Sequence, residues 1–364
     1  MKLIPFLAST ALCLSFALPQ VSLAQASPSA PIADPDMEVV VVRGSRLPES
    51  VPGDVKPELV IGTFEIRTTG ATTLPELLVT LLPQTQSGVR RGDNKPILLV
   101  NGRRVADFSE IRAIPVRAIR RVEVYPEDVA LRYGFPADQK VVNLILVGKF
   151  SITGITGGIG QSADAERETY DLVLDSTKID TNGRTIFSLD AQKASGVSEE
   201  DLGISLSPGG IPSIRSILPE TETYRFSGSV GRSVARLGEQ GYVTLGVDAQ
   251  SDTSQSILSR SSTGAQLARD YEATKAKASA TLEGVAKDRR WNVIVSARSE
   301  DTATRTDRAD GRSRDRTNQN ITGASFDGTV AGPLPGLLAG TGAFSLRTQA
   351  SAEKLEADYQ RGLL

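Results

Sequence analysis

The chain has 364 residues, of which 39% are hydrophobic and 23% charged, and its formal net charge is −2. It contains no histidine and a single cysteine, Cys13, which excludes histidine-based zinc sites, Ser-His-Asp triads and Cys-His dyads. The near-neutral charge gives no electrostatic reason to expect a nucleic-acid partner. The sequence shows no catalytic constellation, so we expect no enzyme activity, no cofactor and no metal site.

Residues 1–24 are typical of a secretory signal peptide. Lys2 supplies the positive start, residues 3–18 are largely apolar, and small residues Ser22 and Ala24 precede the cleavage point. The alternative is a membrane anchor, but the apolar run is shorter than the roughly 20 residues that a spanning helix needs. Cleavage would remove Cys13, so the mature chain would have no thiol chemistry.

Two segments of different character follow. Residues 25–36 are rich in proline, serine and alanine and predict a flexible linker. Residues 37–46 contain four consecutive valines, which have high β propensity but no partner strand nearby in the sequence. Such a run is suited to joining the edge of another protein's sheet. The alternative is an ordinary first strand of the next domain.

Residues 57–147 predict a small mixed α+β domain. The sequence Thr73 to Glu76 is a capping box, and the leucines at 74, 77, 78, 81 and 82 form one apolar stripe of a helix that Pro83 is expected to end. Strands are expected at 60–63, 97–100, 122–125 and 141–147, and short helices at 114–119 and 128–133. Asn101-Gly102 predicts a tight hairpin turn, because both positions tolerate positive φ. Val122 and Val124 should share one face, opposite Glu123.

This stretch resembles the plug domain of TonB-dependent outer-membrane receptors. The matching segments are LLVNGRRV, IPVRAIRRVEVY, ALRYG and VVNLIL, at residues 98–105, 114–125, 130–134 and 141–146. They occur in the order found in that family, and the resemblance covers roughly residues 38–147. Residues 135–140 read FPADQK where many members have a Gly-rich segment, and this departure leaves the substrate open.

The resemblance implies roles for particular residues. The TonB box, which pairs with the inner-membrane partner TonB, would correspond to Glu38, Val39, Val40, Val41, Val42, Arg43 and Gly44. A basic loop would contribute ligand contacts through Arg90, Arg91, Asp93 and Asn94, with a solvated turn as the alternative. The same alternatives apply to Arg103 and Arg104. Residues Arg120, Arg121 and Glu123 would face the inside of a barrel wall.

After residue 147, short runs that alternate apolar and polar residues replace the helical pattern. The apolar faces of these runs are Tyr170, Leu172 and Leu174; Phe187 and Leu189; Tyr224, Phe226 and Val230; Val243, Leu245, Val247 and Ala249; Trp291, Val293, Val295 and Ala297; Ala324, Phe326 and Val330; and Phe344 and Leu346. This pattern is typical of transmembrane β-barrel strands. We expect about nine or ten antiparallel strands over residues 148–364, which would make an incomplete barrel.

The expected connections alternate in length. Long polar ones are predicted at 194–221, 251–270 and 300–318, and shorter ones at 232–240, 284–289 and 333–340. Outer-membrane barrels have long extracellular loops and short periplasmic turns. A soluble β-sandwich would also give amphipathic strands, without that strict alternation.

These features together predict a TonB-dependent receptor in the outer membrane of a Gram-negative bacterium. It would take up a scarce nutrient, such as siderophore-bound iron or another organic or chelated-metal ligand, and its barrel would contact outer-membrane lipid. Ten strands would not enclose a plug, so we expect the N-terminal part of a larger receptor or a truncated product. The alternative is a periplasmic or surface binding module that does not transport.

Overall fold

The computed structural model describes residues 50–51, 55–86, 96–162, 167–205, 213–261, 264–310, 312–334 and 342–362. The chain divides into two compact units, Met1–Ser45 and Arg46–Leu364, and every described residue belongs to the second. The predicted signal peptide, linker and TonB-box segment (1–24, 25–36 and 37–46) therefore lie outside the described residues. The same is true of the four predicted ligand contacts, Arg90, Arg91, Asp93 and Asn94.

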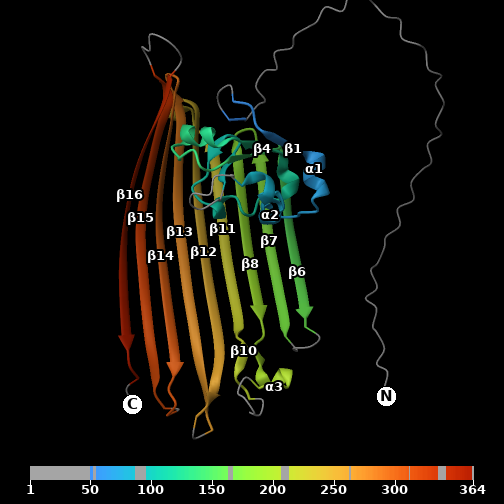
Figure 1. Cartoon of the computed structure of the whole chain (residues 1–364), viewed down its shortest axis with the longest axis vertical. Coiled ribbons are helices and arrows are strands. Elements are labelled where there is room, and N and C mark those ends of the chain that lie inside the picture. The colour runs from blue at the N-terminus through green and yellow to red at the C-terminus, as the bar shows by residue number, and fades with distance from the viewer. Residues whose placement is uncertain are drawn as a thin grey trace, which may run out of the picture. The chain divides into compact units, whose positions relative to one another are not determined.

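Two β-sheets dominate the described unit (Figure 1). One has five strands in the order β1-β4-β5-β2-β3 and belongs to the domain predicted at 57–147, which we call the plug. The other has nine strands in the order β16-β15-β14-β13-β12-β11-β8-β7-β6, which we call the main sheet. The predicted architecture, an α+β domain followed by an incomplete antiparallel barrel, is confirmed.

The plug follows the predicted order of elements. It contains β1 (Leu59–Gly62), α1 (Thr63–Thr68), α2 (Leu74–Thr85), β2 (Ile97–Val100), β3 (Arg103–Arg104), η1 (Phe108–Glu110), η2 (Val116–Ala118), β4 (Ile119–Tyr125), η3 (Glu127–Tyr133) and β5 (Val141–Leu146). The hairpin turn between β2 and β3 is confirmed, with Asn101 at φ 52° and Gly102 at φ 73°. Gly134 ends η3 at φ 78°, where a side chain would be strained.

Helix α2 begins as its sequence predicts. The Thr73 hydroxyl accepts from the Glu76 amide, and the Glu76 carboxylate accepts from the Thr73 amide, so the capping box is formed. The predicted end at Pro83 is wrong, because the helix continues to Thr85. Proline lacks only its own N–H, so its ring at the last turn costs one hydrogen bond and the chain can complete that turn before leaving.

The five-stranded sheet is buried on both faces. On one face Val122 and Val124 pack with Leu77 of α2 in a large apolar cluster. On the other face Tyr125 packs with Val129 of η3 in a second cluster. The predicted separation of Val122 and Val124 from Glu123 is confirmed, and both faces of β4 are inside the plug.

The main sheet is a continuous antiparallel meander. Its strands are β6 (Phe150–Gln161), β7 (Glu168–Asp180), β8 (Gly183–Ala194), β11 (Glu220–Ser233), β12 (Glu239–Arg260), β13 (Gln266–Ala286), β14 (Arg289–Asp307), β15 (Arg314–Leu334) and β16 (Gly342–Gln360). The connection from β8 to β11 carries a small pair of strands, β9 (Val197–Ser198) and β10 (Ser216–Leu218), with α3 (Glu199–Leu202) between them, and η4 (Ala235–Leu237) precedes β12. Within the described residues no pairing joins β6 to β16, so these two strands are the edges.

The two faces of the main sheet differ in chemistry. The predicted apolar residues share the face opposite the plug, which we call the outer face, and many are exposed there, among them Tyr170, Leu172, Phe187, Leu189, Tyr224, Leu245, Val295, Phe326 and Leu346. The other face carries buried polar residues, among them Arg184, Ser188, Ser229, Thr244, Glu283, Asn292 and Thr329. In the described part of the chain no helix has both the length and the apolar character needed to cross a membrane.

Two predicted long loops are wrong. Residues 251–270 belong mostly to β12 and β13, and these two strands pair along β12 from Glu239 to Arg260. Residues 300–318 belong mostly to β14 and β15, which also pair with each other. These segments are polar on both faces, so they show no apolar alternation. Their backbones nevertheless continue the hydrogen-bonded ladder, because strand pairing needs no apolar face where both sides meet water.

Candidate functional site

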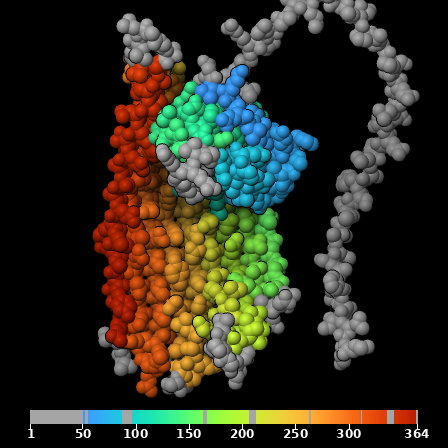
Figure 2. All heavy atoms as spheres, in the orientation of Figure 1, coloured from blue at the N-terminus to red at the C-terminus, as the bar shows by residue number. Residues whose placement is uncertain are grey.

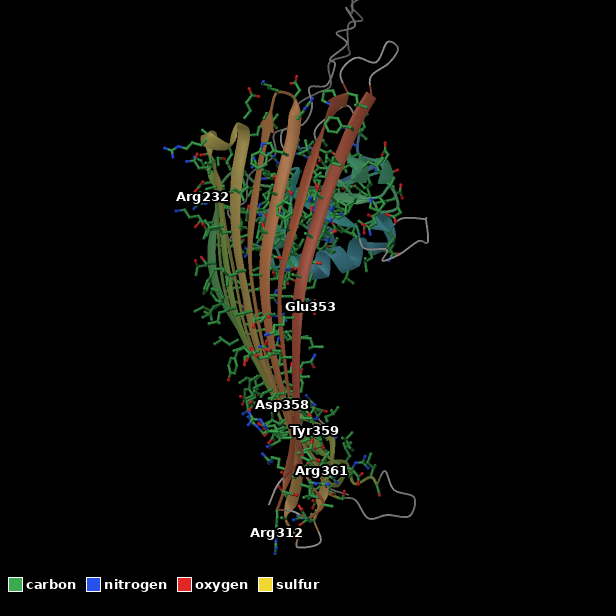
Figure 3. The ribbon with its side chains drawn as sticks, turned by 90° about the vertical axis from the view of Figure 1, so that its left-hand side faces the viewer. Arg232, Arg312, Glu353, Asp358, Tyr359 and Arg361 are labelled. Carbon is green, nitrogen blue, oxygen red and sulfur yellow. The ribbon has the colours of Figure 1, made fainter. Side chains whose placement is uncertain are left out.

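The plug lies against one face of the main sheet, over only part of the length of the long strands (Figure 2). Seen from the side, it lies beside the end of the sheet that carries Arg232, whereas Arg312 marks the opposite end (Figure 3). At the Arg232 end the strands are joined by short turns such as Lys287-Asp288, both with positive φ. The plug–sheet interface is the candidate functional site, because charged side chains of the plug and of the main sheet meet there.

Arg104, at the end of β3, is the most buried cationic contact of the plug with the main sheet. Its guanidinium donates to both oxygens of Asp327 at 3.2 and 3.1 Å, and to Thr329 at 2.9 Å. The close turn at Asn101-Gly102 projects β3 toward the sheet, which explains how a two-residue strand reaches β15.

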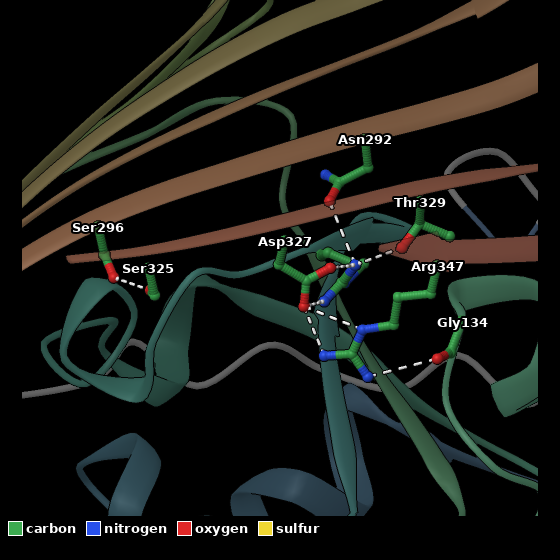
Figure 4. A network of polar contacts seen from close by, with 8 residues as sticks. Gly134, Asn292, Ser296, Ser325, Asp327, Thr329 and Arg347 are labelled. Carbon is green, nitrogen blue, oxygen red and sulfur yellow. Dashed lines mark hydrogen bonds and ion pairs between the residues drawn. The ribbon is translucent and has the colours of Figure 1, made fainter. Parts of the chain in front are cut away.

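Asp327 also accepts from a second guanidinium, that of Arg347 on β16, at 3.0 Å (Figure 4). Arg347 in turn donates to the Gly134 carbonyl of the plug at 3.3 Å. The two guanidiniums lie over the ring of Phe135, at 4.8 and 4.4 Å from its centroid. One carboxylate on the sheet therefore holds two arginines, one from each side of the interface.

A second set of contacts surrounds η1. The buried Glu110 pairs with Arg184 of β8, and its carbonyl accepts from Ser229 at 2.9 Å. Arg112 pairs with Asp190 at 2.8 Å. Asp107 pairs with Lys277.

Burial would raise the pKa of Asp107, but hydrogen bonds from Lys277 and the Ser109 amide outweigh it and hold that pKa below its usual value. Asp107 therefore stays ionised at neutral pH, and its pairing with the sheet persists.

Sequence reasoning placed the wrong charged residues at this interface. Glu123 does not face the main sheet, because it is fully buried inside the plug. Arg121 bonds Glu123 at 2.8 Å, and Arg120 is exposed. Arg103 and Arg104 meet the sheet instead, so neither is a solvated turn residue. The position of Glu123 within an otherwise apolar strand was the one signal in the sequence that this residue is buried.

Glu123 is the centre of a network inside the plug. It accepts from Ser50 at 2.6 Å, from Arg121 at 2.8 Å, from Tyr125 at 2.9 Å and from Asn143 at 3.1 Å. Burial would raise the pKa of Glu123, but these four donors outweigh it and lower the pKa. Burial and the neighbouring carboxylate raise the pKa of Tyr125 to about 12.

This network also holds the start of the described chain. Ser50 bonds Glu123, the Val51 amide donates to the Tyr125 hydroxyl at 3.3 Å, and the Val51 side chain is buried beside Tyr125. The segment predicted to meet TonB ends four residues before Ser50 in the sequence. Ser50 and Val51 are thus the first described residues that connect that segment to the plug core.

Sequence reasoning missed most of the interface residues, namely Asp107, Glu110, Arg112, Arg184, Asp190, Asp327 and Arg347. The charged residues of the main sheet alternate with its apolar outer residues. The alternation therefore predicted which face these charged residues lie on, but not which residues of the plug they contact. Within the described residues, no group of three or more His, Cys, Asp or Glu side chains could hold a metal ion.

No protein-family model matches the chain, and no curated protein matches it either. Among solved structures it is similar to the P. aeruginosa protein FpvA bound to heterologous pyoverdines, at 14% identity and a TM-score of 0.41, over 82% of this chain and 42% of that one. The ferric enterobactin receptor PfeA of Pseudomonas aeruginosa gives 12% identity and a TM-score of 0.35, over 81% of this chain and 55% of that one.

The alcaligin outer-membrane receptor FauA of Bordetella pertussis gives 12% identity and a TM-score of 0.33, over 87% of this chain and 59% of that one. The chain thus spans between about two fifths and three fifths of the length of these proteins. PfeA is a ferric enterobactin receptor and FauA an outer-membrane receptor for alcaligin, whereas the sequence resemblance indicated TonB-dependent receptors and left the ligand open. With TM-scores below 0.5, these likenesses do not bear on what this chain binds.

Proposed function

We propose that the protein is a gated outer-membrane receptor that takes up a small organic or chelated-metal ligand. The observation that carries this proposal is a plug held by charged contacts against the polar face of a sheet whose other face is apolar. A sheet of this kind suits lipid on one side and a filled lumen on the other. The signal peptide and the localisation in the outer membrane of a Gram-negative bacterium belong to the same proposal.

The apolar outer band runs along only one part of the long strands. On β12 the outer face is apolar from Val243 to Ala249 and then turns polar at Ser251 and Thr253. On β14 it is apolar from Trp291 to Ala297. Each run covers seven residues, against the roughly 9–11 that a transmembrane strand needs, so the lipid-facing part would include a few flanking residues. The band lies in the plug-side part of these strands, and the polar remainder would extend outside the cell.

The plug would be moved through its N-terminal segment. Glu38 to Gly44 would pair with TonB, whose pull would reach the plug first at Ser50 and Val51. The plug–sheet contacts include hydrogen bonds and ion pairs, which water can replace as the plug shifts. They also include an apolar contact, because Ile179 and Ile186 of the main sheet belong to the apolar cluster of the plug. The energy would come from the inner-membrane proton gradient.

Deletion of residues 38–44 tests this mechanism. We expect uptake of radioactive iron, supplied as ferric hydroxamate or ferric catecholate chelates, to be lost while binding at the cell surface is retained. Deletion of residues 26–32, an equal length of the predicted linker, is the matched control and should leave uptake intact. Uptake that survives deletion of 38–44 would contradict the mechanism.

The proposed ligand contacts are Arg90, Arg91, Asp93 and Asn94, as the sequence resemblance implies. Replacing both arginines by alanine should weaken surface binding of an anionic chelate about 10-fold or more, because charge-assisted hydrogen bonds are lost. Cell-surface binding isotherms would measure this. Unchanged isotherms would remove these residues from the site.

The second candidate is a binding module without transport. It is favoured by the unpaired edges β6 and β16 among the described residues, since an open edge in lipid leaves backbone groups without partners. Fractionation of cells separates the two candidates. The receptor should need detergent for extraction from the membrane, whereas the binding module should remain in solution once its signal peptide is removed.

A further inference from the structure

A cavity of about 550 Å³ lies between the plug and the main sheet at the short-turn end. On the plug side it is lined by the Asn101-Gly102 turn and Arg103, and on the sheet side by Arg184, Tyr242 and Arg290. Its size is within the range of small-ligand sites in proteins. It shares none of the predicted ligand contacts, which lie in the 87–95 segment.

The guanidiniums of three arginines line this cavity, and they differ in whether they form ion pairs with carboxylates. Arg103 lies 3.2 Å from Glu283, and Arg184 pairs with Glu110. Arg290 donates to the Gly102 carbonyl at 3.1 Å and forms no ion pair with a described carboxylate. One cationic group in the lining is therefore left without an anionic partner.

Neither carboxylate of the lining lies within ion-pair distance of Arg290. Asp180 uses an oxygen to accept from the Asn182 amide at 2.8 Å, within its own turn. Glu283 is the carboxylate beside Arg103. The lining thus holds three guanidiniums and two carboxylates, and Glu110 beyond the lining is the partner of Arg184. The charges are equal in number, but Arg290 is the guanidinium of the lining that forms no ion pair with a described carboxylate.

Two buried donors in the lining have no acceptor. Arg184 is 5% exposed, and its Nε has no hydrogen-bond partner, nor does Nη1 of Arg103, whose approach to Glu283 is not aligned for a hydrogen bond. A buried N–H without an acceptor is unfavourable, and an oxygen placed in the cavity would relieve it. Arg103 is also held in place, because its guanidinium lies 4.0 Å above the Tyr242 ring.

We propose that this cavity binds an oxyanion group, a carboxylate or a phosphate, of a small anionic organic ligand. The planar guanidinium matches the paired oxygens of such groups, and Arg290 supplies a guanidinium that forms no ion pair with a described carboxylate. The inference rests on the proposed function in one respect: the ligand that passes the plug would meet this cavity before leaving the sheet. It adds that the ligand is anionic and that the short-turn end has a site of its own.

Titration calorimetry with the detergent-purified full chain tests the site directly. Citrate and pyrophosphate serve as the carboxylate and phosphate probes, and the polycation spermidine as the probe of opposite charge. We expect binding of at least one anion, no binding of spermidine, and a loss of about 10-fold or more in anion affinity for Arg290→Gln. Arg305→Gln, in an ion pair with Glu272 far along β14, is the matched control and should bind as the parent does.

A second measurement reads the local charge without any ligand. The mature chain would have no cysteine, so Thr181→Cys places a single thiol at the exposed rim of the cavity. An anionic methanethiosulfonate should react with it faster than a cationic one, and the preference should fall in the Arg290→Gln background but not in Arg290→Lys or Arg305→Gln. Arg290→Gln also removes the hydrogen bond from Arg290 to the Gly102 carbonyl and so could weaken plug docking. The thiol measurement remains informative in that case, because Arg290→Lys keeps the charge.

The proposal is overturned if neither citrate nor pyrophosphate binds, or if Arg290→Gln binds both as the parent does. It is also overturned if the anionic reagent shows no preference once each rate is divided by the rate of the same reagent with a free thiol in solution. None of these measurements depends on TonB or on uptake. Loss of the transport mechanism in the 38–44 deletion test would therefore leave this result standing, and loss of the anion site would leave that mechanism untouched.

Discussion

The interior of the plug and its contact with the main sheet are held together by different forces. Inside, Leu77, Val122 and Leu144 pack in a dry apolar cluster. At the interface, Arg104 and Asp327 form charged contacts supported by hydroxyl and amide groups. An apolar core loses its stabilisation when it is opened, whereas polar groups can exchange one partner for water. The difference teaches that apolar packing keeps the plug folded, whereas charged contacts, with the apolar contact of Ile179 and Ile186, set its position on the sheet.

The energetic balance supports the same conclusion. Buried ion pairs recover little more than the cost of removing both charges from water. They do fix one arrangement, because a displaced plug would leave several charges unpaired. The interface therefore determines where the plug lies more than how firmly it is attached.

The largest effect is expected at Glu123, the one charged centre of the plug interior. Glu123→Gln should destabilise the plug by about 3–5 kcal/mol at pH 7, because the fully buried charge at the centre of four hydrogen bonds is lost while the half-buried Arg121 keeps its own charge. Hydrogen exchange of the β4 and β5 amides would measure it. The control is Glu58→Gln, a half-exposed carboxylate in an ion pair with Lys140, which should change little. Equal effects of the two substitutions would contradict the role of the network.

Glu123 also makes the stability of the plug depend on pH. Its pKa is lowered in the folded plug, so its contribution to stability is present above the ordinary carboxyl pKa of about 4.3 and is lost as the pH falls through the folded value. The protection factors of β4 amides, which compare their exchange with that of an unstructured peptide at the same pH, should therefore fall in acid for the parent. Glu123→Gln should show a flatter dependence over the same pH window.

A substitution in the apolar core of the plug should have the second largest effect on its stability. Leu77→Ala should destabilise the plug by about 2–5 kcal/mol, since Leu77 is fully buried and its removal leaves a cavity. Val79 lies on the same helix and is 66% exposed, so Val79→Ala should change stability little. Both variants are compared by exchange of the α2 amides. A large effect of Val79→Ala would indicate that α2 is covered on its exposed face.

The interface should respond less than the core, and in a different observable. Asp327→Asn leaves Arg104 and Arg347 without their shared carboxylate and should weaken docking by about 1–3 kcal/mol. Protease cleavage near Gly134 would become faster and more sensitive to salt, while exchange in β4 and β5 stays unchanged. Faster exchange in β4 would show that docking and folding of the plug are one event.

The smallest effect is expected on the far half of the long strands. Arg305 and Glu272 pair at 2.9 Å with both side chains substantially exposed, so Glu272→Gln should cost about 0.2–1 kcal/mol or less. Thermal unfolding of the detergent-purified chain would measure it. A cost similar to that of Asp327→Asn would remove the distinction between the interface and the exposed sheet.

The sequence by itself determined the features that depend on neighbours along the chain. The capping box of α2, the Asn101-Gly102 turn and the alternation of the strands are local, since each rests on residues a few positions apart. The alternation also separated the apolar outer face from the polar inner face. The prediction of strands from this alternation failed only in 251–270 and 300–318. Both faces of the strands are polar there, so apolar residues do not recur at every second position.

Only the tertiary structure decided which charges meet. Arg104 and Asp327 are 223 positions apart, and Ser50 and Glu123 are 73 apart, so no local pattern pairs them. The burial of Glu123 depends on a second apolar cluster that covers the opposite face of β4. The arginine-lined cavity likewise exists because the plug turn and the sheet turns come together in space. Side-chain period follows from backbone geometry, but partners and burial follow from how separate elements pack.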